Sequence, residues 1–199
     1  MGLPYHYGVT AAVPCPVSVK GPALIVCDHT SMGDPLVLLA TAGRPIRFLM
    51  AKEFFARSHV RWAFEAFRCI PVQRGGRDIR AIRTMLKDLA GQEAIGLFPE
   101  GGLERHRTNE GHPGIGYLAI KSGAPVIPAS IVWERPRSVS SMLKTLFIPC
   151  KATIRYGAPL KFSPEFRPGR ESLQSCTKEI MKQIESLRKT VLKEQHFSP

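Results

Sequence analysis

Short apolar runs separated by longer amphipathic segments set the pattern of this chain. Most of the runs are continuous rather than alternating, which is typical of strands buried on both faces of a sheet. The segments 35–42, 77–89 and 115–122 are predicted helices, and 77–89 carries apolar residues at clear helical spacing. Strands that alternate with helices predict an α/β fold. The predicted strands are 23–27, 46–50, 69–72, 94–98, 125–132 and 152–156.

The two ends of the chain differ in pattern. Residues 1–16 contain three prolines and are predicted to be irregular, followed by a short edge strand at 17–19. Residues 169–194 carry apolar side chains in two rows and predict one amphipathic helix that packs against the rest of the protein. At 199 residues and 44% hydrophobic content, we expect a single domain over 1–199 with a core of its own.

Aromatic and basic side chains are interspersed through residues 52–68, and two interpretations of this segment are open. The aromatic rings can form the buried side of an amphipathic helix. They can also dock, together with the arginines, on an anionic lipid surface. Both interpretations can hold on different faces of the segment. The aromatic residues are Phe54, Phe55, Trp62, Phe64 and Phe67, and the cations are Lys52, Arg57, Arg61 and Arg68.

Composition narrows the choice of partner and compartment. The chain has 28 lysines and arginines against 16 acidic residues, a net charge of +12 that favours an anionic partner. Nucleic acid, an acidic membrane surface and a phosphorylated substrate all fit this charge. No apolar run approaches the roughly 20 residues that span a bilayer. We therefore expect a cytoplasmic protein that does not cross the membrane and lies peripherally on its inner face.

The five cysteines, at positions 15, 27, 69, 150 and 176, stand singly along the chain. They form no C-x-x-C pair, and an odd number of cysteines argues against a disulfide framework. We predict reduced thiols in a cytosolic protein. For the same reason, the sequence predicts no metal site.

The stretch from Asp28 to Pro35 joins the apolar run 23–27 to a helix that is predicted to have Asp34 as its N-cap. His29 and Asp34 are five residues apart, so they meet most easily if the loop bends the histidine back over the helix start. An aspartate that fixes the imidazole tautomer leaves the other ring nitrogen as a general base. The structural alternative is a loop histidine beside an aspartate that only caps the helix.

Neither a G-x-S-x-G elbow nor a plausible catalytic cysteine accompanies this pair. A histidine base without an enzyme nucleophile must activate a group that the substrate brings.

Two further predicted strands end in segments suited to an anion. The run 69–72 leads into Gln73-Arg74-Gly75-Gly76-Arg77, where guanidinium groups beside flexible backbone match phosphate oxygens. The run 94–98 leads into Pro99-Glu100-Gly101-Gly102, which presents a carboxylate and backbone amides at the end of a strand. Plain surface turns are the structural alternative for both segments.

Four blocks in this order resemble the lysophospholipid acyltransferase family, the family of 1-acylglycerol-3-phosphate acyltransferases. The blocks are His29 with Asp34 in H-x4-D, Ile70 to Arg74, Phe98 to Gly101, and Val126 to Pro128. The resemblance covers roughly residues 17–163, and the order and spacing of four blocks is far more specific than any single block. It implies an α/β fold with a mixed, largely parallel sheet flanked by helices.

The resemblance also implies a reaction and roles for individual residues. A fatty acyl group would move from acyl-CoA or acyl carrier protein to the hydroxyl of a lysophospholipid, most directly 1-acylglycerol-3-phosphate, giving phosphatidic acid. His29 would be the base, Asp34 would orient it, and Arg74 would hold the acceptor's phosphate. The donor thioester is already electrophilic, so no enzyme nucleophile is required. The thioester is a co-substrate, and no cofactor is expected. The pocket residues implied are Pro99, Glu100, Gly101 and Gly102 for the acceptor, with Ile127 and Pro128 near the acyl group.

The sequence departs from the family pattern at two positions. Asp28 stands where the family usually has asparagine, and a carboxylate there would favour the imidazolium if it pointed toward His29. Leu103 stands where an arginine is common, with Arg105 and Arg107 as the nearest cations.

Several other functions remain open from the sequence. The acceptor could be a different lysolipid or a glycerol-type molecule, and the same histidine could activate water in a hydrolase. A non-catalytic basic protein on an anionic membrane or on nucleic acid is the alternative outside enzymes. Against nucleic acid, the chain has no zinc finger, RNA-binding signature or basic coiled coil.

Overall fold

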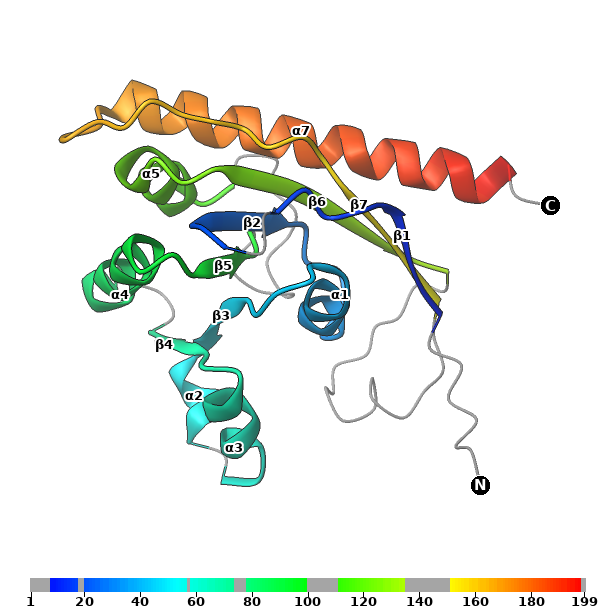
Figure 1. Ribbon diagram of the computed structural model, residues 1–199, viewed down its shortest axis with the longest axis horizontal. Helices are drawn as coiled ribbons and strands as arrows, with labels where there is room; N and C mark the ends of the chain where they lie inside the picture. Colours follow the sequence, from blue (N-terminus) through cyan, green and yellow to red (C-terminus); the bar gives the residue numbers. More distant parts are fainter. Residues whose placement is uncertain are drawn as a thin grey trace.

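The computed structural model describes residues 8–17, 20–56, 58–73, 78–99, 111–134 and 151–197, and Figure 1 shows their arrangement. In this part of the chain, seven strands form one sheet in the order β1-β7-β6-β2-β5-β3-β4. The strands are β1 (Gly8–Val13), β2 (Ala23–Cys27), β3 (Arg47–Ala51), β4 (Ile70–Val72), β5 (Ala94–Leu97), β6 (Val126–Trp133) and β7 (Lys151–Tyr156). The helices are α1 (Asp34–Thr41), α2 (Lys52–Phe55), α3 (Ser58–Ala66), α4 (Ile79–Ala90), α5 (Pro113–Ser122) and α7 (Arg170–Phe197).

The central strand of the sheet is β2. It pairs in parallel with β5 on one side and with β6 on the other, and β3 and β4 continue the parallel arrangement beyond β5. β7 joins β6 in the antiparallel direction, and β1 then pairs with β7 in parallel. The predicted α/β fold with a mixed, largely parallel sheet is therefore confirmed. The carboxyl ends of β2 to β6 all lie at one edge, where open α/β sheets bind their ligands.

Helices cover both faces of the sheet, which explains why β2 is a continuous apolar run. Leu24 and Val26 pack in the core formed with α4, α5 and α7, whereas Ile25 and Cys27 pack in the core formed with α1. All residues of β2 are buried. Burial of one large aliphatic side chain of this kind contributes roughly 1.5–3 kcal/mol to stability. In Figure 1, α7 lies lengthwise over the β6 and β7 side of the sheet, far from α2 and α3.

The structure corrects the sequence prediction near the amino terminus. Residues 8–13 were predicted to be irregular and form β1, an edge strand that is mostly exposed. Its sequence is short and only weakly apolar, so its pairing with β7 decides its conformation. The strand predicted at 17–19 is not seen at Val17, which is irregular, and residues 18–19 lie outside the described part.

The aromatic segment of the sequence forms two short helices, α2 and α3, rather than one helix. Phe64 is buried, and the ring centroids of Phe54 and Phe55 lie 6.4 Å and 5.5 Å from its own. Trp62 and Phe67 are exposed, by 70% and 47% respectively. The interpretation as core is therefore confirmed for Phe64, against which Phe54 and Phe55 lie half-buried, whereas Trp62 and Phe67 are exposed.

Candidate functional site

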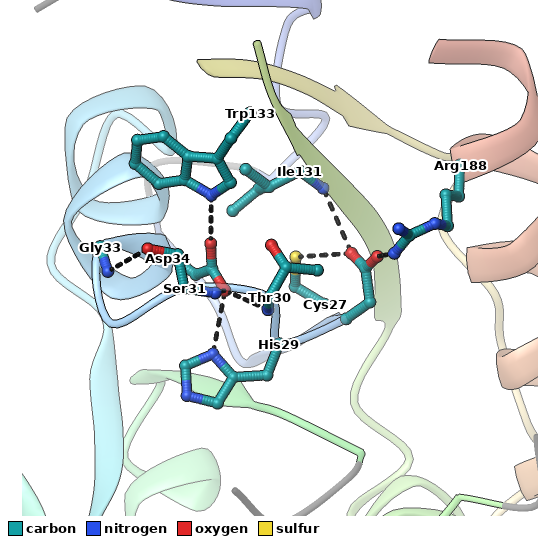
Figure 2. Close-up of polar contacts among 10 residues, drawn as sticks. Cys27, His29, Thr30, Ser31, Gly33, Asp34, Ile131, Trp133 and Arg188 are labelled. Atoms are coloured by element: carbon teal, nitrogen blue, oxygen red, sulfur yellow. Dashed lines mark hydrogen bonds and ion pairs between the residues drawn. The ribbon is translucent and has the colours of Figure 1, made fainter. Parts of the chain in front are cut away.

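His29 and Asp34 meet at the carboxyl end of β2. Nδ1 of the imidazole lies 2.9 Å from Oδ2 of the carboxylate. Figure 2 shows the two side chains pointing toward one another. The loop between β2 and α1 bends His29 back over the start of the helix, as the spacing predicted. A carboxylate only accepts hydrogen bonds, so Nδ1 carries the proton in this contact and the lone pair of a neutral ring lies at Nε2. The side chain of His29 is 12% exposed, and that of Asp34 is fully buried.

Both carboxylate oxygens of Asp34 accept hydrogen bonds. Oδ2 also accepts from the backbone N–H groups of Thr30, at 2.6 Å, and Ser31, at 2.8 Å. Oδ1 accepts from the indole Nε1–H of Trp133 at 2.8 Å. The prediction that Asp34 is the N-cap of the helix is wrong by one position, because Gly33 is the cap and Asp34 is the first helical residue. Its side chain turns back toward the loop, and a carboxylate in the first turn also interacts favourably with the helix dipole.

A row of aromatic rings holds the plane of the imidazole. Phe98, which follows β5, stacks on His29 with the ring centroids 4.2 Å apart and the planes inclined by 21°. Phe48 of β3 stacks on Phe98 in turn, at 5.9 Å. Gly96 makes room for this ring, since a Cβ at position 96 would lie 2.2 Å from Cε1 of Phe48. The three rings thus form a row from the loop after β2, past β5, to β3.

Sequence reasoning assigned no role to Phe98 or to Trp133. Both follow or end a predicted buried strand, and those strands, β5 and β6, prove to flank β2. The signal that could have found them is an aromatic residue at the carboxyl end of a buried run. Such a residue faces the ligand-binding edge of a parallel sheet.

Asp28 does not bond to the neighbouring imidazole. Its Oδ1 accepts from the backbone N–H of Ile131 at 3.2 Å and from the thiol of Cys27 at 3.6 Å, and its Oδ2 accepts from Arg188 at 2.7 Å. Figure 2 shows Arg188 reaching this position from α7. Asp28 therefore joins the end of β2 to β6 and α7. Burial raises the pKa of the Asp28 carboxyl above its ordinary value, although Arg188 and the N–H of Ile131 act in the opposite direction.

Several predicted acceptor-site residues and nearby cations follow β4 and β5 in the sequence. Pro99 is buried, and its carbonyl accepts a hydrogen bond from the backbone N–H of His112 at 3.2 Å, which places the start of α5 beside the end of β5. The following predicted residues lie outside the described part of the chain: Arg74, Glu100, Gly101, Gly102, Arg105 and Arg107.

Ile127 and Pro128 lie in the middle of β6, where they pair with Ile25 and Val26. Both are buried within the sheet. The structure thus places this block on the strand beside the one that leads to His29. Its predicted role near the acyl group stays a prediction.

Three of the cysteines have thiols whose pKa is raised, so none of these three is an activated nucleophile. Burial raises the pKa of the thiols of Cys15, Cys69 and Cys176, in the last case to about 12. A thiol with a raised pKa is a poor nucleophile at neutral pH. Within the described ranges, no group of three or more histidine, cysteine, aspartate or glutamate side chains could hold a metal ion.

Among the described residues, no helix is both long enough and apolar enough to cross a bilayer.

The fold and the site together define an α/β enzyme with a histidine–aspartate pair at the carboxyl edge of its sheet. The family model described as Acyltransferase matches residues 9–132, which is more than half of the chain. The chain belongs to this acyltransferase family and is an O-acyltransferase. The resemblance that the four sequence blocks suggested is therefore confirmed for the family.

Two particular proteins are similar to this one. The 1-acyl-sn-glycerol-3-phosphate acyltransferase of Bacillus subtilis (strain 168) is 28% identical over 170 residues, which cover 82% of this chain and 80% of the relative. The crystal structure of the 1-acyl-sn-glycerophosphate (LPA) acyltransferase, PlsC, from Thermotoga maritima shares the fold. It has a TM-score of 0.63 at 19% identity, over 92% of this chain and 73% of that chain.

Asp28→Asn should change how stability depends on pH. Because burial raises the pKa of Asp28 in the folded protein, the folded state holds this proton more tightly than the unfolded state. The stability from this group is largest below the unfolded pKa of about 3.9 and decreases as the pH rises through the folded value. Urea unfolding across this range should show the wild-type advantage over Asp28→Asn falling with rising pH. A difference that stays constant would contradict the raised pKa.

Two further variants control this measurement. Glu93→Gln removes a carboxylate from a surface ion pair with Arg68, and its difference from wild type should change little over the same pH range. Arg188→Met leaves the Asp28 carboxylate buried without its cation, and it should destabilise the protein by about 3–5 kcal/mol at neutral pH. Adding Asp28→Asn to Arg188→Met should recover part of that loss.

Proposed function

We propose that this acyltransferase moves a fatty acyl group from acyl-CoA or acyl carrier protein to the free hydroxyl of 1-acylglycerol-3-phosphate, giving phosphatidic acid. The observation that carries the proposal is the contact between His29 Nδ1 and Asp34 Oδ2 at the carboxyl end of β2, in a chain of the acyltransferase family. The acceptor is supported by the name of the Bacillus subtilis relative.

In the proposed reaction, His29 is the general base. Its Nδ1–H donates to Asp34, so Nε2 takes the proton of the acceptor hydroxyl as the hydroxyl oxygen attacks the thioester carbonyl. The carboxylate of Asp34 stabilises the imidazolium that forms. The C–S bond of the tetrahedral intermediate then breaks, and the imidazolium gives its proton to the leaving thiolate. The acyl carbon passes from sulfur to oxygen without a covalent enzyme intermediate.

The Ser31 hydroxyl and the Cys27 thiol, both near His29 in sequence, support this direct transfer, because each has a local hydrogen bond to a group other than the imidazole. The Oγ of Ser31 accepts from the backbone N–H of Gly33 at 3.2 Å. The thiol of Cys27 donates to Asp28. Serine and cysteine nucleophiles normally require a base within hydrogen-bond reach. The geometry favours a base that acts on the substrate's own hydroxyl.

The phosphate of the acceptor is proposed to bind toward the β3 and β4 side of the same edge. Arg74 directly follows Gln73, whose backbone N–H donates to the Asp78 carboxylate at 3.0 Å. Lys52, the first residue after β3, lies 3.7 Å from the same carboxylate. Neighbouring strands are about 4.8 Å apart, so three spacings separate the ends of β2 and β4 by about 14 Å. A glycerol phosphate and an extended arginine side chain together can bridge such a span.

The membrane partner is proposed to dock on the crossover from β3 to β4, which α2 and α3 form. This crossover begins at Lys52, at the sheet edge where His29 also lies. It carries the exposed rings of Trp62 and Phe67, and the chain as a whole has a net charge of +12. Exposed aromatic rings enter the interface of a bilayer while cations meet anionic headgroups. A lysophospholipid could then present its headgroup to the site without leaving the surface of the membrane.

His29→Ala should remove nearly all acyl transfer, because it removes the base. Asp34→Asn should lower kcat by about 10²-fold or more, because the amide no longer fixes the imidazole tautomer or supplies the negative charge that stabilises the imidazolium. A labelled acyl thioester and lysophosphatidic acid provide the assay, and urea unfolding verifies that each variant folds. Glu93→Gln removes a carboxylate from the residue before β5, at the opposite edge of the sheet, and should keep wild-type turnover. Wild-type turnover in folded His29→Ala would refute the mechanism.

Arg74→Ala should raise KM for lysophosphatidic acid with less effect on kcat, because the proposed contact with the phosphate binds the ground state and the transition state equally. Each charge-assisted hydrogen bond to a phosphate contributes about 1.5–3 kcal/mol, or roughly 10- to 150-fold in affinity. Arg74→Lys should recover only part of this, since lysine lacks the planar fork. Arg170→Ala, an exposed arginine at the start of α7, is the control. Equal losses with an acceptor that lacks phosphate would assign Arg74 a structural role.

Replacing Trp62 and Phe67 with serine should weaken binding to vesicles that contain an anionic phospholipid. Binding by wild type should also fall in high salt, because exposed charges are screened over roughly 8 Å at physiological ionic strength. Phe166→Ser is the control, since this 82% exposed ring belongs to the segment before α7 and not to the crossover. Co-sedimentation measures all three proteins. Vesicle binding that does not change with salt, with lipid charge or with the crossover substitutions would exclude this docking surface.

A further inference from the structure

Four hydrogen bonds to the Asp34 carboxylate come from the described residues. Of these four donors, only the Trp133 side chain belongs to a strand of the sheet. The other three donors belong to residues 29–31, in the loop that precedes α1, and all three bond to Oδ2. Oδ1 accepts its bond from the indole of Trp133, at 2.8 Å. Figure 2 shows the indole and the imidazole on opposite sides of the carboxylate.

This arrangement suits a tryptophan for chemical reasons. The indole Nε1–H is a donor and never an acceptor, so it can bond a carboxylate but cannot take a proton from it or compete with it for His29. Asp34 is fully buried, and a buried carboxylate oxygen without a donor is costly. The backbone that carries the indole is held in the sheet, because Trp133 is the last residue of β6 and pairs with Ala152 of β7.

We propose that Trp133 is a positioning residue for acyl transfer, which fixes Oδ1 of Asp34 so that Oδ2 stays on Nδ1 of His29. The proposal rests on the proposed function of His29 as the base. With Oδ1 held by the indole, rotation of the carboxylate about its Cβ–Cγ bond would break the bond to Trp133 as well as the bonds at Oδ2. The carboxylate is then already in place when the imidazolium forms, which is the pre-organisation that transition-state stabilisation requires.

The test removes the indole N–H and leaves an aromatic ring. Trp133→Phe should lower kcat about tenfold and change KM for lysophosphatidic acid by less than about twofold, since about 1.4 kcal/mol of transition-state stabilisation corresponds to tenfold. Nuclear magnetic resonance of ¹⁵N-histidine protein follows the Nδ1–H proton of His29, assigned by its loss in His29→Ala. In Trp133→Phe this resonance should move upfield or broaden by exchange with water.

Tyr156→Phe is the matched control. Its hydroxyl lies 2.7 Å from Oγ1 of Thr41, at the last turn of the same helix that begins with Asp34. The variant therefore removes one buried polar contact to α1 and should lower stability by a similar amount, while kcat and the Nδ1–H resonance stay as in wild type. Loss of kcat in Tyr156→Phe equal to that in Trp133→Phe would mean that only the packing of α1 matters, and would overturn the proposal.

A double-mutant cycle separates this proposal from the proposed function. If Trp133 acts through Asp34, Trp133→Phe should have no further effect on kcat in an Asp34→Ala background. A tenfold loss in both backgrounds, or wild-type kcat and resonance in Trp133→Phe, would overturn the role of Trp133 while leaving His29 as the base. Turnover in His29→Ala would instead refute the base, and the cycle would still report whether Trp133 and Asp34 are coupled.

If the Trp133→Phe variant does not fold, 3-benzothienylalanine can be incorporated at position 133 instead. This analogue has the shape of tryptophan with sulfur in place of the N–H group, so the packing is retained and the hydrogen bond is lost. The proposal expects the same loss of kcat as in Trp133→Phe. Wild-type kcat in the analogue protein would overturn it.

Discussion

A buried carboxylate must find its hydrogen-bond donors within the protein, and this constraint organises the site. Asp34 has no exposed surface, and its donors come from the loop after β2, from the imidazole and from the end of β6. These groups converge only if β2 and β6 are neighbours and α1 begins directly above them. The sheet order and the position of His29 therefore both serve to provide the buried Asp34 carboxylate with hydrogen-bond donors.

Local patterns made much of the fold and the centre of the site predictable from sequence. The apolar run before His29 marks a doubly covered strand, and the five-residue spacing to Asp34 requires a bent loop, which the structure has. The edge strand β1 was missed because its weakly apolar sequence becomes a strand only through pairing with β7, far along the chain. Tertiary context of this kind overrides local propensity.

Long-range partners could not be predicted, since no spacing along the chain encodes them. Asp28 lies next to the base in sequence, which suggested an effect on the imidazole, but its carboxylate bonds to Ile131 and Arg188 instead. A strand-end residue projects to one side or the other according to the register, and only the neighbouring elements decide which. The departure from asparagine at position 28 thus goes together with a cation on the last helix.

The ion pair between Asp28 and Arg188 joins residues separated by 160 positions. During synthesis, the end of β2 emerges from the ribosome long before α7 exists, so the nascent chain has a carboxylate beside His29 without its cation. Contacts of such long sequence separation form late and slow the folding of a chain. The site is therefore completed only when the last helix has docked, and a chain released early would have the motif residues without the support behind them.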